Sequence, residues 1–177
     1  MKWPTKKERE ILETQGFIKE YKRLPHGRNF VVEEERDIPD RIVRDTKTND
    51  IFGIELTSVY LDDRSVPDDH MREGDTFVPF SMSEIKVYER RILETIIDKV
   101  CKARRHYNYD HPLILSVYVN EYISLHMGME YWKSFSSRYN LLFDCFAPFE
   151  EIVLWPLTSD DKDRPLVISA KMEKRNQ

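Results

Sequence analysis

The stretch of this 177-residue chain that decides the fold is PDRIVRDTKTNDIFGIELTSVY, residues 39–60. Two runs rich in β-branched residues, Arg41–Thr46 and Ile51–Tyr60, flank the polar segment KTND, which is typical of a β-hairpin turn. Antiparallel pairing brings the start of the first strand beside the second half of the other. Because side chains alternate between the two faces of a strand, we expect the carboxylates of Asp40 and Glu55 to converge.

At these residues the chain resembles the PD-(D/E)XK nuclease superfamily. The signature of that family is a strand-opening Asp followed by Glu (or Asp)-x-Lys on the next strand, and Pro39-Asp40 and Glu55-Leu56 match it. Thr57 stands where the family usually carries its lysine. The resemblance covers roughly residues 5–120. It implies hydrolysis of phosphodiester bonds in DNA or RNA, assisted by Mg²⁺ or Mn²⁺.

The resemblance also implies roles for individual residues. Asp40 and Glu55 are expected to be the metal ligands, because hard divalent cations prefer carboxylate oxygens. Glu8, on the first predicted helix, is a candidate third carboxylate, although helix capping is its simpler role. Thr57 is expected to form hydrogen bonds around the metal site. Lys86 is expected to replace the missing lysine, because a strand-helix-strand crossover would start its helix near the end of the Glu55 strand; the alternative is an ordinary surface lysine.

The order of the remaining elements supports the same fold class. The segment Thr5-Lys6-Lys7-Glu8 has a capping-box pattern and predicts a helix that ends at Gly16. Periodicity predicts the other elements: strands Phe30–Glu35, Leu113–Asn120, Ile152–Leu157 and Leu166–Ala170, and helices Ser83–Arg105 and Met129–Phe143. An αβββαβ core with a C-terminal helix and strands predicts a three-layer α/β/α sandwich around a central mixed sheet, as one domain over residues 1–177.

Composition favours a cytoplasmic protein that packs a hydrophobic core. Hydrophobic residues make up 40% of the chain, and no segment approaches the run of about 20 apolar residues that spans a bilayer, so no membrane partner is expected. Cys101 and Cys145 have no neighbouring cysteine or suitably spaced histidine, which predicts buried free thiols. The glycines form no phosphate-cradling loop, which argues against a nucleotide-binding fold. The sequence leaves the oligomeric state open.

Charge is distributed unevenly, although the formal net charge is −4. Between Glu84 and Arg105 the chain carries seven basic and four acidic residues. Such a helix is either a phosphate-binding face or a solvated flank. Tyr107, Tyr109 and His111 alternate before the next strand, where they would either stack on nucleic-acid bases or pack at the rim of the core.

Two functions of different classes follow from these patterns. The first is a metal-dependent nuclease acting on DNA or RNA. The second is a nuclease-like fold that has lost catalysis and serves as a nucleic-acid-binding or protein-interaction module. Thr57 favours the second function, whereas the paired acids Asp40 and Glu55 favour the first, because neighbouring carboxylates repel each other unless a cation lies between them.

Overall fold

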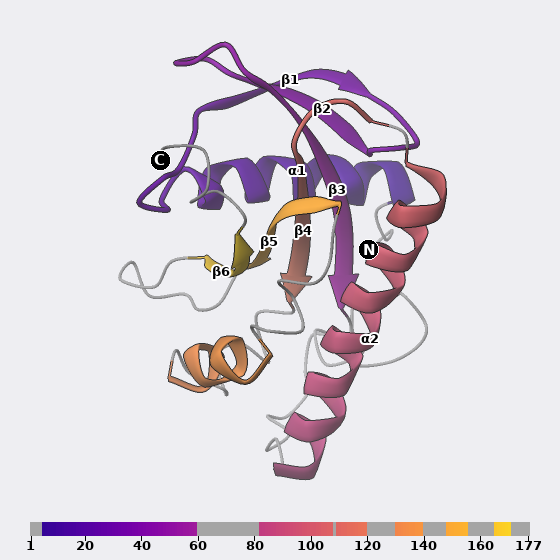
Figure 1. The fold of residues 1–177 in the computed structure, drawn as a ribbon, viewed down its shortest axis with the longest axis vertical. Coiled ribbons are helices and arrows are strands. Elements are labelled where there is room, and N and C mark those ends of the chain that lie inside the picture. Colours follow the sequence, from indigo (N-terminus) through magenta and orange to yellow (C-terminus); the bar gives the residue numbers. More distant parts are fainter. Residues whose placement is uncertain are drawn as a thin grey trace.

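The computed structural model describes residues 5–59, 82–107, 109–119, 130–139, 148–155 and 165–170. Six strands within these ranges form one sheet in the order β1-β2-β3-β4-β5-β6 (Figure 1). They are β1 (Phe30–Glu35), β2 (Arg41–Asp45), β3 (Ile51–Val59), β4 (Leu113–Val119), β5 (Phe149–Trp155) and β6 (Leu166–Ala170). β3, β4 and β5 pair in parallel, and the other neighbours pair antiparallel. The predicted mixed sheet and its β2–β3 hairpin are confirmed.

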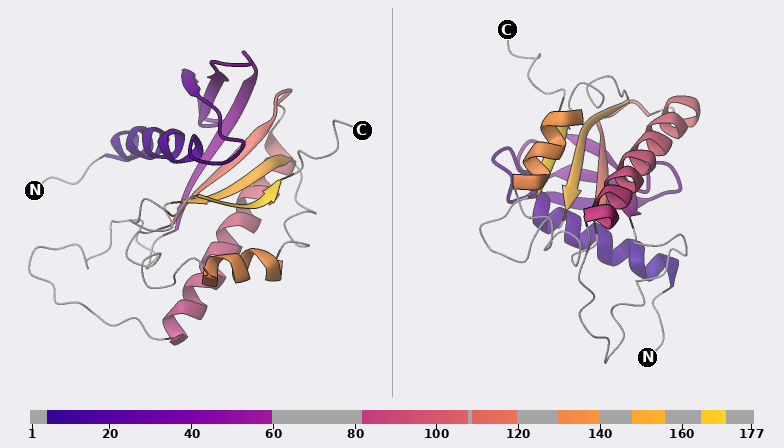
Figure 2. Two further views of the ribbon diagram at one scale, coloured as in Figure 1. Left: turned by 90° about the vertical axis from the view of Figure 1, so that its left-hand side faces the viewer. Right: turned by 90° about the horizontal axis from the view of Figure 1, so that it is seen from below.

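Helices cover both faces of this sheet (Figures 1 and 2). α1 (Lys6–Tyr21) buries Phe17 in one cluster, and α2 (Met82–His106) buries Ile96 in the other. Residues 130–139 are also helical and add buried aromatic side chains to the cluster that contains α2. The arrangement is the predicted three-layer α/β/α fold, and the order of elements through β4 is the predicted αβββαβ.

The central strand β3 divides its side chains between the two layers. Ile54 and Leu56 belong to the cluster that contains α1, and Val59 belongs to the cluster that contains α2. Full burial of one such aliphatic side chain contributes about 1.5–3 kcal/mol, so this alternation fixes the register of the strand. Glu55 consequently faces the α2 layer.

The first helix is longer than its sequence signals suggest. It begins with the predicted capping box, in which the Thr5 side chain accepts the Glu8 N–H and the Glu8 carboxylate accepts the Thr5 N–H. It continues past Gly16, the predicted end, to Tyr21. A Cβ atom at Gly16 would lie 2.9 Å from the Trp155 ring, so this glycine permits close packing on the sheet and does not end the helix.

The second helix runs back along β3 from beyond the carboxyl end of that strand. The Tyr88 hydroxyl donates to the Val59 carbonyl at 2.6 Å, which places Tyr88 level with the end of β3. The buried stripe of the helix contains Ile92, Ile96 and Val100. Cys101 follows Val100 by about 100° around the helix and is exposed, so the prediction of a buried thiol there was wrong.

The fifth strand begins at Phe149, three residues before its predicted start. Glu150 and Glu151 interrupt the apolar pattern from which the start was predicted. Glu151 is 2% exposed and accepts a hydrogen bond from the Tyr21 hydroxyl at 2.8 Å. His26 Nε2 lies 3.3 Å from the same carboxylate oxygen. A buried acid that is satisfied by distant partners gives no local signal of a strand. The predictions for Tyr60, Asn120, Met129, residues 140–143, Cys145 and residues 156–157 lie outside the described residues.

Candidate active site

Asp40 sits where β2 begins and the edge of β3 becomes uncovered. Pairing between the two strands starts at Arg41, which lies opposite Ile54, so β2 does not cover β3 beyond that point. The Asp40 carboxylate takes the place of the next strand residue: its Oδ2 accepts the Leu56 N–H at 2.7 Å. A backbone donor that the sheet would otherwise leave unpaired therefore holds the carboxylate in place.

Glu55 is buried beside this position and is paired with a cation from α2. It is 3% exposed, and Lys99 Nζ lies 2.6 Å from its Oε1. Its Oε2 is buried and has no hydrogen-bond partner within the described part of the chain. A buried carboxylate oxygen without a donor is costly, so this atom is available to a ligand that supplies positive charge or a proton.

The electrostatics of the site follow from the closeness of the two acids. Burial, together with the negative charge of Glu55, raises the pKa of Asp40 to about 6, against the lowering effects of the Leu56 N–H and the Lys99 ammonium. Burial also raises the pKa of the Tyr107 hydroxyl, and hydrogen bonding to Glu55 and the negative charges of Glu55 and Asp40 raise it further. Tyr107 and Tyr109 both pack against the hydrophobic cluster that contains α2, so the alternative of packing at the rim of the core is confirmed for these two residues.

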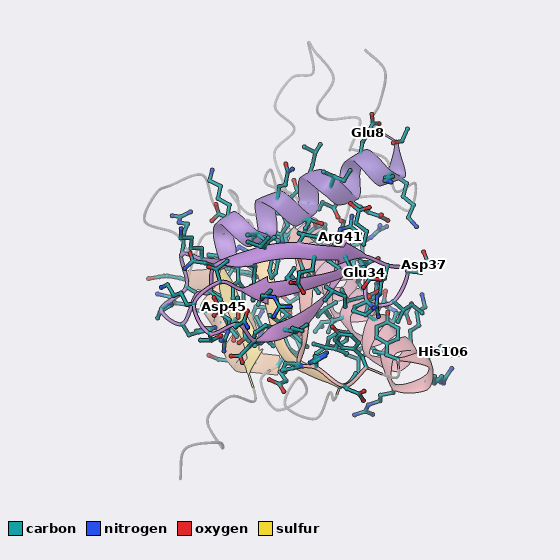
Figure 3. All side chains as sticks on the ribbon, turned by 90° about the horizontal axis from the view of Figure 1, so that it is seen from above. Glu8, Glu34, Asp37, Arg41, Asp45 and His106 are labelled. Atoms are coloured by element: carbon teal, nitrogen blue, oxygen red, sulfur yellow. The ribbon has the colours of Figure 1, made fainter. Side chains whose placement is uncertain are left out.

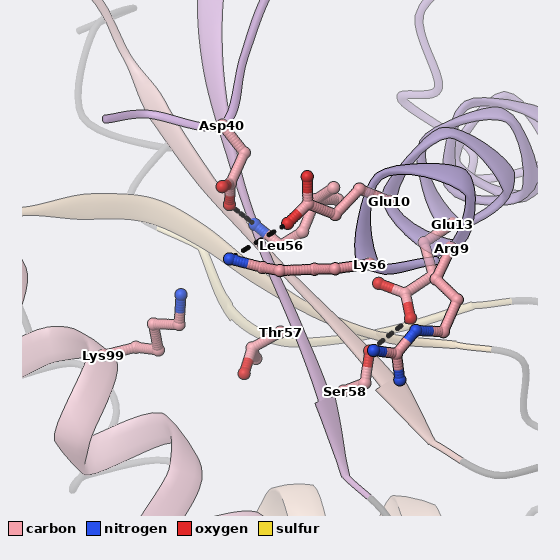
Figure 4. A pocket seen from close by; sticks show the side chains of 9 residues that line it. All are labelled: Lys6, Arg9, Glu10, Glu13, Asp40, Leu56, Thr57, Ser58 and Lys99. Atoms are coloured by element: carbon pink, nitrogen blue, oxygen red, sulfur yellow. Dashed lines mark hydrogen bonds and ion pairs between the residues drawn. The ribbon is translucent and has the colours of Figure 1, made fainter. Parts of the chain in front are cut away.

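A hollow of about 340 Å³ opens in front of Asp40, between α1, β3 and α2. Figure 4 shows the Lys99 ammonium and the Thr57 hydroxyl on one side of it and the side chains of α1 on the other. Lys6 and Glu10 cross this space as an ion pair of 3.5 Å. The hollow is thus open to solvent on the uncovered edge of β3 and is lined by charges of both signs.

The structure places Asp40, Glu55 and Thr57 beside the part of β3 that β2 does not cover, but it does not place Lys86 there. Lys86 is exposed and lines a different hollow together with Glu89 and Arg138. The expectation that an early helical residue reaches the acids was wrong, because the helix starts beyond the strand. Lys99 follows Tyr88 by eleven residues, or about 16 Å of helix, which matches the roughly 13 Å of strand from Val59 back to Glu55.

Glu8 is likewise not the α1 carboxylate of the site. Its carboxylate accepts hydrogen bonds from the backbone N–H and the hydroxyl of Thr5, so it caps the helix. Glu10 lines the hollow instead, and its charge contributes to raising the pKa of Asp40. Helical spacing would have favoured Glu10 had the face of α1 been known, since Glu10, Thr14 and Phe17 recur at intervals of four and three residues.

The donors at this edge suit a hard divalent cation. Among the described residues, no three His, Cys, Asp or Glu side chains are grouped as a metal site. Two acids are nevertheless present, and Glu55 Oε2 is buried without a hydrogen bond from the part of the chain that the structure describes. Mg²⁺ commonly binds one or two protein carboxylates and completes its shell with water and substrate phosphate, so this pair fits such an ion.

Comparison with family models, with curated proteins and with solved structures finds no match. In the described part of the chain, no helix combines the length and the apolar character needed to cross a bilayer.

Proposed function

We propose that the chain is a metal-dependent nuclease of the PD-(D/E)XK type, which hydrolyses phosphodiester bonds in DNA or RNA. One observation carries the proposal: Asp40 and Lys99 line an open hollow at the uncovered edge of β3, and the buried Glu55 pairs with Lys99 and raises the pKa of Asp40. Two acids and one cation are the residue types that the superfamily signature requires. Here the cation comes from a helix and not from the strand.

Asp40 and Glu55 would hold Mg²⁺ or Mn²⁺ in this site. The ion would supply Lewis acidity that activates water and neutralises charge on the phosphoryl oxygens. The protein's own contribution is orientation. The Leu56 N–H fixes the Asp40 carboxylate, and Lys99 fixes one oxygen of Glu55, so that the remaining oxygens are presented without reorganisation of the backbone.

In the superfamily, the lysine that stands two residues after the motif Glu provides a positive charge. In this chain, Lys99 would provide that charge. Thr57, at that position, lines the same hollow as Lys99, so both side chains border one space (Figure 4). A fixed ammonium in a partly buried site stabilises negative charge that develops on the phosphate in the transition state. Thr57 then contributes a hydroxyl for hydrogen bonding and leaves room for the longer side chain.

A second candidate function is a catalytically inactive module that binds nucleic acid or protein. The ion pair itself favours this alternative, because Lys99 already neutralises Glu55 without a metal. A buried pair of this kind is also a means of holding α2 against the sheet. The two functions differ in whether the acids bind a divalent ion and whether any substrate is cut.

The test is incubation of the protein with single-stranded and duplex DNA and RNA in Mg²⁺ and in Mn²⁺. The control is Glu55→Ala, which removes one proposed ligand. Cleavage that requires the metal and disappears in the control supports the nuclease. Absence of cleavage from all four substrates, or equal cleavage by the control, rejects the nuclease in favour of the inactive module.

A further inference from the structure

Arg41, the residue that follows Asp40, is a buried cation that has no carboxylate partner among the described residues. It is 3% exposed, and its Nη1 donates to the Asp40 carbonyl at 2.6 Å. Its Nη2 is buried and makes no hydrogen bond to any described residue. Within the described part of the chain, no Asp or Glu oxygen lies within ion-pair distance of its guanidinium.

Among the residues that the structure describes, this lack of an ion-pair partner sets Arg41 apart from its neighbours. Arg41 lines a hollow of about 520 Å³ with three other cations, Lys6, Lys7 and Arg36, and with four acids, Glu10, Glu35, Asp37 and Asp40. Each of these three lies within 4.0 Å of a glutamate: Glu10 at 3.5 Å, Glu35 at 3.8 Å and Glu34 at 2.7 Å, respectively. Burying an unpaired charge is strongly unfavourable, so the guanidinium is poised for an anion that is not part of the described chain.

The hollow around Arg41 adjoins the hollow in front of the acids. Both hollows are lined by Asp40, Lys6 and Glu10, so they are neighbours that share these three side chains. Figure 3 shows Arg41 at the same end of the sheet as Glu34 and Asp37, below α1. Lys6 and Lys7 have side chains that are 85% and 76% exposed, so they can rearrange to admit a ligand. A chain-like ligand lying across Asp40 would reach Arg41 next.

We propose that Arg41 binds a phosphate group of the substrate strand, next to the phosphate that lies at Asp40 and Glu55. This inference rests on the proposed nuclease function. A guanidinium is the side chain best matched to phosphate, because its planar set of N–H donors pairs with two oxygens at once. Arg41 has the unused donor Nη2, and phosphate supplies the missing negative charge. The same contact would place the scissile bond relative to the acids.

The experiment measures binding to a labelled single-stranded DNA of about 12 nucleotides by fluorescence anisotropy in EDTA, so that no strand is cut. In Arg41→Met we expect the Kd to rise roughly tenfold or more, because a charge-assisted hydrogen bond is lost. The salt dependence of log K should flatten by about 0.7, the contribution of one phosphate contact. Arg41→Lys, which keeps the charge but not the planar fork, should give an intermediate Kd.

The matched control is Arg44→Met, on the same strand, because Arg44 is satisfied by Glu33 at 2.5 Å. Its Kd should stay near that of the wild-type protein. Strands with and without a 5′-phosphate distinguish a terminal phosphate from an internal one, and an Arg41-dependent Kd with either supports the site. The melting temperature of Arg41→Met without DNA should equal or exceed that of the wild type, because an unpaired buried charge is removed.

A lower melting temperature together with an unchanged Kd would show that Arg41 is neutralised within the chain, which overturns the proposal. Failure of the wild-type protein to bind any strand overturns it as well. Because binding is measured without metal, its outcome is separate from that of the cleavage assay. Arg41-dependent binding without cleavage would reject the enzyme alone and leave the phosphate site in place.

Discussion

Lys99 Nζ and Glu55 Oε1 lie 2.6 Å apart although 44 residues separate them in the sequence. The contact joins the middle of α2 to the centre of the sheet, and Glu55 is almost fully buried. It gives the candidate site a cation that the strand motif lacks. It also neutralises a buried acid, so the same pair is expected to affect both stability and chemistry.

The stability of the pair is tested by a double-mutant cycle. Lys99→Met should lower the free energy of unfolding by about 3 kcal/mol, because it leaves the Glu55 charge buried and uncompensated. Glu55→Gln combined with Lys99→Met should cost less than the two single changes together, with a coupling of about 1–3 kcal/mol. Urea denaturation at pH 7 measures all four proteins. Strict additivity would mean that the two side chains do not interact.

The raised pKa of Asp40 predicts that this residue destabilises the fold at neutral pH. Its pKa is about 6 in the folded protein, whereas the ordinary pKa of an aspartate side chain is 3.8, so the folded state binds the proton more tightly than the unfolded state. Stability contributed by the protonated form is therefore present below pH 4 and lost as the pH rises towards 6. Above pH 6 the ionised carboxylate lowers the free energy of unfolding by as much as about 3 kcal/mol.

Asp40→Asn tests this pH dependence, because asparagine keeps an acceptor for the Leu56 N–H but carries no charge. We expect the variant to be more stable than the wild type at pH 8 and to lose that advantage at pH 4. Urea unfolding across this range gives the difference directly. A gain in stability that is the same at both pH values would contradict the assignment of the effect to the carboxylate charge.

We expect the two α1 carboxylates, Glu10 and Glu8, to differ in their effect on metal affinity. Glu10 lines the hollow and contributes to the raised pKa of Asp40, whereas Glu8 caps the helix. Glu10→Gln should weaken Mn²⁺ binding about tenfold, the usual effect of removing a group that surrounds a metal site. Glu8→Gln should leave the Mn²⁺ affinity unchanged and slightly lower the helix stability. Calorimetric titration compares the two variants, and equal affinities would exclude a role for Glu10.

Sequence patterns were sufficient to predict the hairpin and the position of its acids. The alternation of Ile54, Glu55 and Leu56 fixes which face each side chain occupies, and the pairing of Arg41 with Ile54 follows from the turn. These relationships are local, so short-range periodicity contains them. The capping role of Thr5 and Glu8 was evident for the same reason.

The partner of Glu55 could not be predicted in this way. Which residue of α2 lies level with Glu55 depends on where the helix starts relative to the strand, and that offset is a tertiary property. Lys86 and Lys99 both lie on a basic helix. Helical periodicity places Lys99 within the arc of the buried residues Tyr88, Ile92 and Ile96 and places Lys86 outside it, but the level of Lys99 against Glu55 is fixed by the contact of Tyr88 with Val59. Gly16 shows the same limit, since its role comes from the distant Trp155 ring.

The most direct test of the proposed active site compares Lys99→Met with Lys86→Met in a single-turnover cleavage assay with Mg²⁺ or Mn²⁺. Both variants remove one lysine from the same helix, and circular dichroism checks that each is folded. We predict that Lys99→Met slows cleavage about 100-fold or more, because a charge that stabilises the transition state is lost, whereas Lys86→Met cleaves at the wild-type rate. Equal rates for Lys99→Met and the wild type, or slower cleavage in Lys86→Met alone, would contradict the assignment of Lys99 as the catalytic cation.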